Sequence, residues 1–525
     1  MSNIKTFSFD KNQFNIIKKY RFGSDWPVVY IIENGKEAYV GETTDAYARS
    51  NQHWENPERH KLNKLHIISD EEYNKSAALD IESSLIEYMS GDGTLVLQNS
   101  NGGLSDHSYY DREKYTAKFE VIWDNLKKKA LVKKELIQIR NSDIFKYSPY
   151  KALTEEQFNI VESIRAMIGL KDTRVNLVSG NPGTGKTIVA TYLVKRLLEL
   201  EETKNMKIGL VVPMTSLRST LKKVFRKVKG LNANMVIGPS DVAKDKYDLL
   251  IVDEAHRLKR RVNITNYKSF DKITKMLGFE VDGNELDWII KQSTYQVLFY
   301  DKNQSVKPSD IRPDVFLKLN TVNYELTSQL RVKAGEEYIE YVENILECNN
   351  PPKKVFKDYE FYIYDDINKM VKDIKEKDKD YGLARMVAGY AWPWNTKGKS
   401  DNESFDIEID GLKLKWNSTN IDFINSPNAI NEVGCIHTVQ GYDLNYTGLI
   451  IGPEVYYDKD SNQIMIDPKK YFDMNGKRSI NAPEELKRYI INIYKTLMTR
   501  GIRGTYLYVC DEPLREYMKK YVSDN

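Results

Sequence analysis

The sequence predicts an α/β protein in which a small mixed α/β domain precedes two lobes, each built on a doubly wound parallel sheet. From Lys151 onward, apolar runs with the composition of buried strands alternate with amphipathic helical segments, as in parallel sheets covered by crossover helices. This alternation occurs twice, before and after Pro313. The expected strands are 174–180, 208–214, 247–254 and 296–301 in the first lobe, and 361–366, 382–390, 446–454 and 504–511 in the second.

The length of the chain also indicates several domains. A chain of 525 residues exceeds one ordinary hydrophobic core, and usual domain sizes suggest about three or four compact units. We expect domains at 1–110, 149–315 and 316–525, with a polar insertion near 395–420 in the last. Residues 111–148 are densely charged and helical in pattern, and we interpret them as a helical linker. Such a run forms either a solvated helix or a basic face against DNA.

Composition excludes several classes of protein. The net charge is +3, so binding to nucleic acid would depend on local patches. Three cysteines that lie far apart favour neither a disulfide framework nor a zinc site, and they fit a reducing cytoplasm. No apolar run approaches the roughly 20 residues that span a bilayer, and the N-terminus lacks the apolar core of a signal peptide. We therefore expect a cytoplasmic protein without membrane association, whose oligomeric state is left open.

A glycine-rich segment, GNPGTGKT, is a full match to the pattern G-x-x-x-x-G-K-[ST]. It follows an expected strand and opens an expected helix, which is the context that the motif requires. Backbone N–H groups would approach nucleotide phosphates, Lys186 would reach the β- and γ-phosphates, and Thr187 would hold Mg²⁺. The sequence thus predicts ATP and Mg²⁺ as cofactors. The expected nucleotide-binding residues of this loop are Gly180, Asn181, Pro182, Gly183, Thr184, Gly185, Lys186 and Thr187.

An acidic pair, Asp253 and Glu254, ends the apolar strand LLIVDE. A carboxylate at the end of a strand suits coordination of Mg²⁺ by Asp253, and Glu254 would polarise the attacking water. By itself the pair is also compatible with a surface turn. Behind a phosphate-binding loop it is a second indication of nucleotide hydrolysis.

From Lys151 onward the chain resembles a superfamily 1 helicase-type ATPase, and more narrowly the Schlafen-like bacterial DNA/RNA helicase domain. This resemblance implies two RecA-like lobes. The motifs that carry it are LTEEQ (153–157), VVPMTSLRSTL (211–221), FYDKNQ (299–304), LTSQLR (326–331), ARMVAGYAWPW (384–394), IHTVQGYD (436–443) and LMTRG (497–501). Their order is that of the family, and they cover nearly all of 150–525. Taken singly, residues such as Gln304, Arg331 or Arg500 would be ordinary surface residues.

The resemblance implies particular roles within these motifs. The residues concerned are Gln157 as reader of adenine, Gln304 as sensor of the γ-phosphate, Gln440 in the motif that couples ATP to the strand, Arg331, and Arg500 as arginine finger. The family usually has Glu where this chain has Asp443, so the role of Asp443 stays open. Hydrolysis between two lobes, with single-stranded nucleic acid across them, would produce stepping. Trp392 and Trp394 would either stack on bases or pack inside the second lobe.

Near the N-terminus, residues 28–43 read VVYIIENGKEAYVGET, two apolar runs joined by Asn-Gly. This pattern is typical of a hairpin. Tyr30 and Tyr39 lie one in each run, and alone they would indicate ordinary cross-strand packing. Arg49 and His53 follow at i,i+4 spacing, which places both on one face of a helix.

A carboxylate and an amide complete this N-terminal set. Glu82 shares a helix face with Leu79 and Ile86, where a carboxylate is costly unless it binds something. Alone it would be a surface residue. Asn99 follows this helix in LQNSNGG. The pattern VVY-x₈-YVG, followed by Arg, His, Glu and Asn in this order, resembles the GIY-YIG nuclease core, with Val28 replacing the first glycine of the family name.

The resemblance implies metal-dependent phosphodiester hydrolysis, which needs an activated water, a divalent cation and cationic groups at the phosphate. Glu82 would be the metal ligand, for Mg²⁺ with Mn²⁺ as the alternative. Arg49 would clamp the phosphate, and His53 would assist proton transfer or contact the leaving group. One of the two tyrosines would position or deprotonate the water, and the sequence does not decide which. The expected catalytic residues of the whole chain are Tyr30, Tyr39, Arg49, His53, Glu82, Asn99, Glu254, Arg331 and Arg500.

The combined prediction is a metal-dependent endonuclease fused to an ATP-dependent DNA translocase or helicase. Such a fusion suggests bacterial defence against phage or other foreign DNA. Three alternatives stay open: an RNA-directed enzyme, an ATPase with a non-catalytic nucleic-acid-binding N-terminal module, and a nucleotide-gated switch that senses nucleic acid without stepping. DNA is favoured over RNA as the partner.

Overall fold

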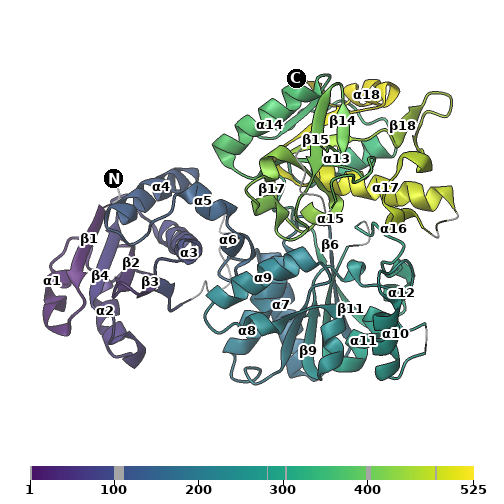
Figure 1. The fold of residues 1–525 in the computed structure, drawn as a ribbon. Coiled ribbons are helices and arrows are strands. Elements are labelled where there is room, and N and C mark those ends of the chain that lie inside the picture. Colours follow the sequence, from purple (N-terminus) through teal and green to yellow (C-terminus); the bar gives the residue numbers. More distant parts are fainter. Residues whose placement is uncertain are drawn as a thin grey trace. The chain divides into compact units, whose positions relative to one another are not determined.

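The computed structural model describes residues 3–99, 112–280, 282–301, 304–397, 404–478, 480 and 482–525. Contacts divide the chain into two compact units. One comprises the chain up to Ser163 together with Thr191–Lys195, and the other comprises Ile164–Ala190 and Arg196–Asn525. Figure 1 gives the labels of the helices and strands.

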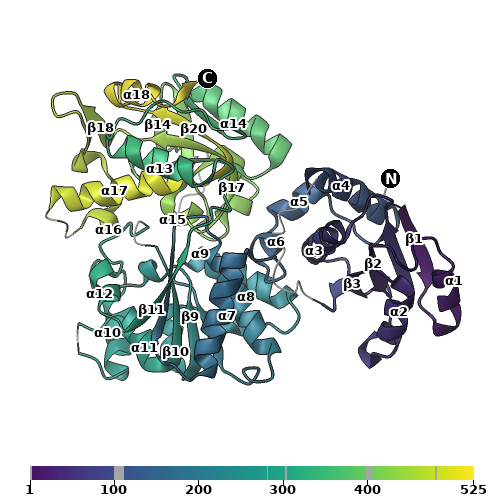
Figure 2. The ribbon, with the colours of Figure 1, turned by 180° about the vertical axis from the view of Figure 1, so that it is seen from behind.

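The N-terminal unit contains a five-stranded sheet in the order β1-β4-β2-β3-β5 (Figures 1 and 2). The strands are β1 (Asn3–Ser8), β2 (Val28–Glu33), β3 (Glu37–Thr43), β4 (Lys64–Ser69) and β5 (Val96–Leu97). Neighbouring strands are antiparallel except β3 and β5. The helices are α1 (Phe14–Lys18), α2 (Ala46–Trp54), α3 (Lys75–Asp92), α4 (Arg112–Lys128), α5 (Leu136–Asn141), α6 (Asp143–Tyr147) and the start of α7 (Glu155–Gly169).

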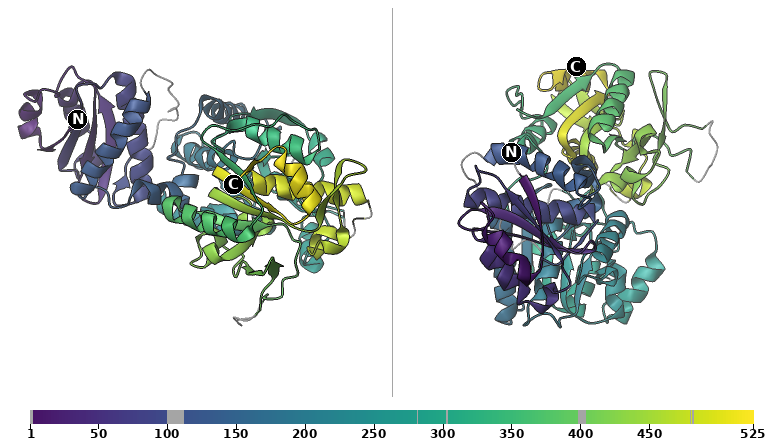
Figure 3. Two further views of the ribbon diagram at one scale, coloured as in Figure 1. Left: turned by 90° about the horizontal axis from the view of Figure 1, so that it is seen from above. Right: turned by 90° about the vertical axis from the view of Figure 1, so that its left-hand side faces the viewer.

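Successive side chains of β2 enter two different cores. Val29 and Ile31 pack in the core that contains α3 and α4, whereas Val28, Tyr30 and Ile32 pack in the core on the side of α1 and α2. Figure 3 (left) shows this sheet, in purple, between the two layers of helices. Because both faces are covered, β2 is buried along its whole length and reads as a continuous apolar run.

Helix α4 differs from the expected linker. Its residues Phe119, Ile122 and Trp123 are buried in the core that contains α3. The indole Nε1 of Trp123 donates to the backbone oxygen of Lys134 at 3.0 Å, which holds the following turn against the helix. The buried residues of α4 recur three or four positions apart, with exposed residues between them, as in an amphipathic surface helix. The segment after residue 111 is therefore part of the N-terminal unit.

The first large sheet of the second unit has six parallel strands in the order β11-β6-β10-β9-β7-β8. The strands are β6 (Val175–Gly180), β7 (Ile208–Val211), β8 (Val236–Ile237), β9 (Tyr247–Val252), β10 (Ser293–Tyr300) and β11 (Thr321–Leu326). The helices between and after them are α8 (Lys186–Glu199), α9 (Thr215–Lys227), α10 (Tyr267–Met276), α11 (Glu285–Gln292) and α12 (Pro313–Leu317). The four strands predicted for this lobe are β6, β7, β9 and β10, whereas β8 and β11 were not predicted.

The second large sheet has eight strands in the order β14-β15-β16-β13-β17-β20-β12-β21. They are β12 (Glu360–Tyr364), β13 (Ala384–Ala388), β14 (Ile407–Ile409), β15 (Leu412–Trp416), β16 (Glu432–Cys435), β17 (Leu444–Ile451), β20 (Gly501–Val509) and β21 (Ser523–Asp524). The longer helices are α13 (Gly335–Leu346), α14 (Ile367–Tyr381), α17 (Pro483–Met498) and α18 (Glu512–Lys519), and the short ones are α15 (Ile436–Val439) and α16 (Met474–Lys477). The predicted strands β12, β13, β17 and β20 pair in parallel, which confirms the α/β fold class.

Helices cover both faces of this second sheet. Met386 of β13 packs in the core that contains Ile374 of α14, while the next residue, Val387, packs in the core that contains α13 and α17. Crossover helices on both faces are what a doubly wound parallel sheet requires. A separate two-stranded hairpin, β18 (Val455–Asp458) and β19 (Gln463–Ile466), was not predicted.

The polar insertion expected near 395–420 contributes the antiparallel hairpin β14–β15 to the edge of the second sheet. Its residues 398–403 lie outside the described residues. Trp392 and Trp394 are half-buried beside other rings of the same lobe, with centroids 6.5 Å from Trp416 and 6.4 Å from Tyr390, respectively. Base stacking by these tryptophans stays a prediction.

In the part of the chain that the structure describes, no helix combines the length and apolarity needed to cross a membrane.

Candidate functional sites

The glycine-rich loop connects the end of β6 to the start of α8. Gly183 and Gly185 have φ of 91° and 81°, in the left-handed region that glycine adopts without strain. Lys186 is the first residue of α8, and its Nζ donates to the backbone oxygens of Gly180 at 2.6 Å and Asn181 at 2.9 Å. The ammonium thus folds back across the loop, where it would meet phosphate oxygens.

A hydroxyl and a carboxylate meet beside this loop. Thr187 Oγ1 donates to Asp253 Oδ2 at 2.7 Å, and Asp253 is fully buried just after β9. Burial and the neighbouring Glu254 carboxylate raise the pKa of Asp253, although the Thr187 hydrogen bond and the Lys186 ammonium oppose this. A divalent cation bound here would favour the charged carboxylate. Hydroxyl and carboxylate oxygens are ligands that Mg²⁺ prefers, so these residues fit that ion.

Glu254 adopts φ 52°, in the left-handed region that side chains rarely occupy. Its Oε2 lies 3.1 Å from Nε2 of His256. Burial lowers the pKa of His256 to about 3, so this imidazole is neutral at ordinary pH. A buried carboxylate therefore lies next to Asp253 at the carboxyl end of β9, where a water-polarising group was expected.

Residues from both lobes converge on Gln304. Its amide Nε2 donates to Asp301 Oδ2 at 2.7 Å, and Lys186 Nζ lies 3.7 Å from the same oxygen. On the other side, Gln304 Oε1 accepts from Arg500 Nη2 at 3.4 Å and from Gln440 Nε2 at 3.5 Å. The structure therefore brings together one predicted residue of the first lobe and two of the second.

The segment that contains Arg331 lies directly on the glycine-rich loop. Gln329 Nε2 donates to the backbone oxygen of Pro182 at 2.7 Å, and the next residue donates its N–H to the backbone oxygen of Gly183 at 2.9 Å. A Cβ added to Gly183 would lie 2.1 Å from Gln329 Oε1, so only glycine permits this approach. Arg331 itself forms an ion pair with Asp443. Sequence reasoning gave no role to Gln329, although it lies inside the LTSQLR motif.

Gln157, the expected reader of adenine, has a structural role at the start of α7. Its side-chain oxygen accepts from the backbone N–H of Thr154 at 3.1 Å, and the hydroxyl of Thr154 accepts from the backbone N–H of Gln157 at 3.2 Å. This reciprocal pair is a capping box. Recognition of a base by Gln157 stays a prediction.

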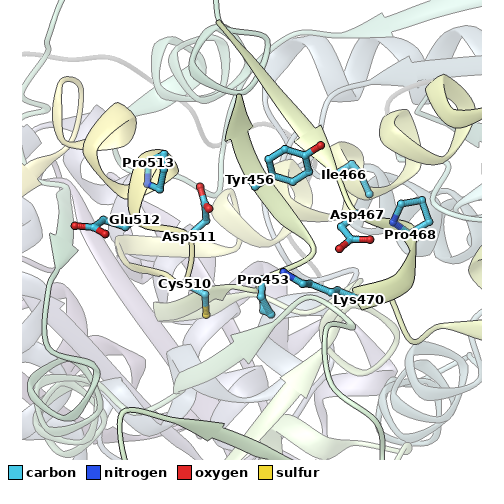
Figure 4. Close-up of a pocket in the computed structure, with 10 residues that line it drawn as sticks. All are labelled: Pro453, Tyr456, Ile466, Asp467, Pro468, Lys470, Cys510, Asp511, Glu512 and Pro513. Atoms are coloured by element: carbon cyan, nitrogen blue, oxygen red, sulfur yellow. The ribbon is translucent and has the colours of Figure 1, made fainter. Parts of the chain in front are cut away.

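Two cavities of similar size differ in their relation to these residues. A cavity of about 770 Å³ adjoins the glycine-rich loop at Gly180 and Asn181, and aromatic rings such as Tyr300 and Phe316 line its other side. A cavity of about 730 Å³ lies between the hairpin β18–β19 and the start of α18, and no predicted site residue lines it (Figure 4). Of these two cavities, only the first lies beside the expected phosphate-binding groups.

In the N-terminal unit, two polar side chains meet the hydroxyl of Tyr30. His53 Nε2 lies 2.6 Å from Tyr30 Oη, and Arg49 Nε donates to the same oxygen at 3.2 Å. Both partners come from one face of α2, which begins at its N-cap Asp45. Burial and the Tyr39 phenol raise the pKa of Tyr30, and the hydrogen bond from Arg49 acts in the opposite direction.

The pairing of the hairpin leaves room for this cluster. Tyr30 lies opposite Gly41 in the β2–β3 register, and a Cβ added to Gly41 would be 2.3 Å from Tyr30 Oη. The Tyr30 and Tyr39 rings stack with centroids 6.2 Å apart, and Tyr39 also lies 4.7 Å from the His53 ring. The two tyrosines therefore face one shared polar cluster.

Arg59 was not predicted and is part of the same cluster. Its guanidinium lies over the Tyr39 ring, 3.7 Å from the centroid, and its Nη1 donates to Nδ1 of His53. It belongs to a short 3₁₀ turn, Pro57–Arg59, that follows α2. No spacing rule of a helix or strand connects this turn to the predicted residues, so the sequence pattern gave no signal for it.

Glu82 is half-buried on α3. Burial and then the Glu42 carboxylate raise the pKa of Glu82 to about 7, while Lys75 and Arg49 act against this. A nearby cation would stabilise the charged form. Among the described residues, no three His, Cys, Asp or Glu side chains are grouped to hold a metal. A cation at Glu82 would thus take most of its ligands from water and substrate, which is usual for Mg²⁺.

Asn99, the last predicted member, is bound to the backbone. Its Nδ2 donates to the oxygen of Val40 at 2.7 Å, and its Oδ1 accepts from the N–H of Val40 at 3.2 Å. Both ends of the amide therefore bind β3, next to Tyr39. A catalytic contribution from Asn99 stays a prediction.

Comparison with known proteins finds one family model and several relatives. Residues 173–511 match a family model described as the Schlafen group 3, DNA/RNA helicase domain. The uncharacterized protein YPL245W of Saccharomyces cerevisiae is 27% identical over 386 residues, which are 65% of this chain and 82% of that protein. The signal recognition particle receptor FtsY of Metamycoplasma hominis is 25% identical over 254 residues, covering 43% of this chain and 70% of that protein. The crystal structure of the Pif1 helicase from Candida albicans has a TM-score of 0.29 and 9% identity, covering 68% of this chain and 94% of that one.

Proposed function

Because this chain belongs to the Schlafen group 3 DNA/RNA helicase family, we propose that its second unit is an ATP-driven motor that moves along single-stranded nucleic acid. The observation that carries the proposal is the contact of Gln440 and Arg500 with Gln304. A nucleotide held by the glycine-rich loop would complete this network from both lobes, so hydrolysis would change how the lobes are joined.

In the proposed hydrolytic step, five side chains take part. Lys186 would leave the backbone oxygens it now binds and pair with the phosphates of ATP. Thr187 and Asp253 would hold Mg²⁺, which when bound would neutralise charge at the phosphates. Glu254 accepts a proton from, or orients, the attacking water, and Arg500 stabilises the charge that develops on the γ-phosphate.

A second contact between the lobes connects the nucleotide residues to α9. Tyr442 Oη lies 2.7 Å from Ser216 Oγ and 3.0 Å from Thr220 Oγ1, both on α9. Arg500 Nη1 donates to the backbone oxygen of Tyr442 at 3.2 Å. A shift of Arg500 during hydrolysis would therefore be transmitted to α9 through Tyr442.

The start of α9 lines a polar pocket of about 270 Å³ that Arg257, Lys259 and Lys307 also line, together with Asp310, whose Oδ2 lies 3.0 Å from Arg257 Nη1. Cationic side chains and the N-terminus of a helix both favour phosphate groups. We assign this pocket to the backbone of the bound strand. Hydrolysis at Lys186 and binding at α9 would then be coupled through Tyr442.

Measurement of ATP hydrolysis tests the motor. The rate is measured without nucleic acid and with single-stranded DNA or RNA of the same base sequence. We expect stimulation by at least one of them, with DNA favoured over RNA, and displacement of an annealed strand in the presence of ATP. No hydrolysis would overturn the proposal. Stimulated hydrolysis without displacement would favour a nucleotide-gated switch.

We also propose that the N-terminal unit cleaves phosphodiester bonds in a metal-dependent reaction. The observation that supports this is the meeting of Tyr30, Tyr39, Arg49 and His53 in one cluster. Two phenols, a guanidinium and an imidazole are the groups needed to orient water and to stabilise a pentacoordinate phosphate.

In this reaction Arg49 would bind a non-bridging phosphate oxygen, and a tyrosine hydroxyl would hold the attacking water. Mg²⁺ at Glu82, with Mn²⁺ as the alternative, would supply Lewis-acid stabilisation of the phosphate. His53, which contacts both the Tyr30 hydroxyl and the Tyr39 ring, would move a proton within the cluster.

Incubation of the full chain with plasmid, linear duplex, single-stranded DNA and RNA tests the nuclease, each with Mg²⁺ and with and without ATP. We expect at least one DNA substrate to be cut only when the divalent cation is present. Failure to cut any of them would favour the alternative in which the N-terminal unit binds nucleic acid without cleaving it.

A further inference from the structure

The cluster around Tyr30 contains a second guanidinium with a defined task. We infer that Arg59 is a positioning residue that fixes the tautomer of His53 and thereby directs two hydrogen-bond donors at the hydroxyl of Tyr30. The functional consequence rests on the nuclease proposed above, whereas the tautomer itself does not. No motif of the sequence includes Arg59.

The argument begins with the chemistry of the guanidinium. Arginine has five N–H donors and no acceptor, and it stays protonated at any ordinary pH. Arg59 Nη1 contacts Nδ1 of His53 and lies farther, at 3.4 Å, from Nε2. Nδ1 must therefore accept the hydrogen bond, which leaves the proton of a neutral imidazole on Nε2.

The second step concerns the hydroxyl that Nε2 faces. Nε2 of His53 lies 2.6 Å from Tyr30 Oη, and a protonated Nε2 donates to that oxygen. Arg49 Nε donates to the same oxygen at 3.2 Å. Tyr30 Oη thus accepts twice, so its own proton is directed to neither partner. With the opposite tautomer, Nε2 of His53 would accept a hydrogen bond from the Tyr30 hydroxyl. The Tyr30 oxygen would then have one hydrogen-bond donor fewer.

The position of Arg59 is itself fixed by a ring. Its guanidinium lies 3.7 Å from the centroid of Tyr39, the other tyrosine of the hairpin. Stacking of arginine on an aromatic face is favourable and orients the planar group. The Arg59 guanidinium therefore contacts the Tyr39 ring with its face and His53 with its edge. Because His53 also contacts Tyr30, Arg59 couples the two tyrosines of the cluster through His53.

The first test is spectroscopic and needs no substrate. Nitrogen-15 chemical shifts of the histidine rings are recorded on the full chain labelled at histidine, and His53→Gln assigns the signal of His53 among the six histidines. We expect the proton on Nε2 in the natural chain and a mixture of tautomers in Arg59→Met. Arg59→Lys, which keeps a cationic donor, should retain the Nε2 proton. An unchanged His53 signal in Arg59→Met would overturn the inference.

The second test is kinetic. Arg59→Met keeps an apolar stem against Tyr39, so we expect kcat for cleavage to fall about tenfold to a hundredfold while KM changes less than about twofold. Arg59→Lys should recover part of kcat. The matched control is Arg21→Met, which removes an exposed arginine of the same unit that pairs with Glu71. A tautomer that shifts without any loss of kcat would refute the role in cleavage.

The two readouts separate the inference from the function on which it rests. If the natural chain cuts no nucleic acid, the proposed nuclease fails, but the His53 signals still decide whether Arg59 sets the tautomer. If the chain cuts and Arg59→Met behaves like Arg21→Met in both measurements, the nuclease stands and the positioning role of Arg59 is rejected.

Discussion

The two candidate sites are assembled in different ways. The candidate phosphate-binding site takes most of its groups from one continuous segment of eight residues, 180–187, in which Gly183 and Gly185 adopt left-handed conformations. The N-terminal cluster takes its side chains from two strands, one helix and a short turn. A contiguous site is positioned by its own backbone, whereas a dispersed site depends on the packing of every element that contributes to it.

This difference has a physical consequence for mutation. In the loop, the essential groups are backbone N–H donors and one ammonium, so a change elsewhere in the lobe leaves the local geometry intact. In the N-terminal cluster, Tyr30 Oη is held by two side chains from α2 and by the absence of a side chain at Gly41. A small change in any neighbour is then transmitted to the hydroxyl.

The largest effect is expected from Lys186→Ala. Removal of the ammonium leaves the phosphates of ATP without their main positive partner, and ATP hydrolysis should fall at least about 10³-fold. Cleavage of nucleic acid in the absence of ATP should be unchanged. Lys204→Ala, an exposed lysine that pairs with Glu201, is the control. Steady-state hydrolysis at saturating ATP measures the effect, and an unchanged rate would remove the loop from the mechanism.

Glu82→Gln tests the dispersed site by the same logic. Loss of the carboxylate removes the expected metal ligand, so Mg²⁺-dependent cleavage should fall about 10²-fold or more while ATP hydrolysis stays constant. Asp80→Asn removes a carboxylate of the same helix that pairs with Arg112, and it should retain cleavage. Rates are compared over a titration of Mg²⁺. Equal loss in both variants would mean that the charge of α3, and not a ligand at Glu82, is what matters.

The sequence was informative where a function is encoded locally. The glycine-rich loop, Asp253 and the parallel strands around them could be predicted, because a phosphate site needs a fixed run of residues and buried parallel strands are uniformly apolar. Tyr30, Arg49 and His53 were predicted as one cluster from a resemblance in spacing, and the structure brings them within hydrogen-bonding distance.

The rest depends on contacts that no local pattern encodes. Arg59 reaches His53 only because a turn after α2 folds back, and Gln329 reaches Pro182 only because β11 lies beside β6. Helix α4 was interpreted as a linker because its composition is charged, yet buried residues such as Trp123 recur at helical spacing and fix it to the N-terminal core.

A smaller effect is expected from Gly41→Ala, which tests packing at the dispersed site directly. The added Cβ would be 2.3 Å from Tyr30 Oη and 3.0 Å from Cε1 of Tyr39, so both rings must move. We expect cleavage to fall about tenfold, because a displaced Tyr30 loses alignment with its donors. Gly169→Ala, where an added Cβ meets nothing within 4 Å, is the control. Full cleavage by Gly41→Ala, with an unchanged melting temperature, would show that Tyr30 is not held as described.

The smallest effect is expected from Asp443→Asn, which tests whether the loop site too depends on a distant residue. Arg331 pairs with Asp443, so if Arg331 binds ATP as proposed, ATP would compete with this carboxylate for the guanidinium. Pairs of this partly exposed kind contribute about 1 kcal/mol or less, and we expect KM for ATP to fall about threefold at most. Asp422→Asn, which breaks an ion pair with Lys223, should leave KM unchanged. A rise in KM would mean that Asp443 contacts the nucleotide itself, and the loop site would then resemble the N-terminal cluster in its dependence on remote side chains.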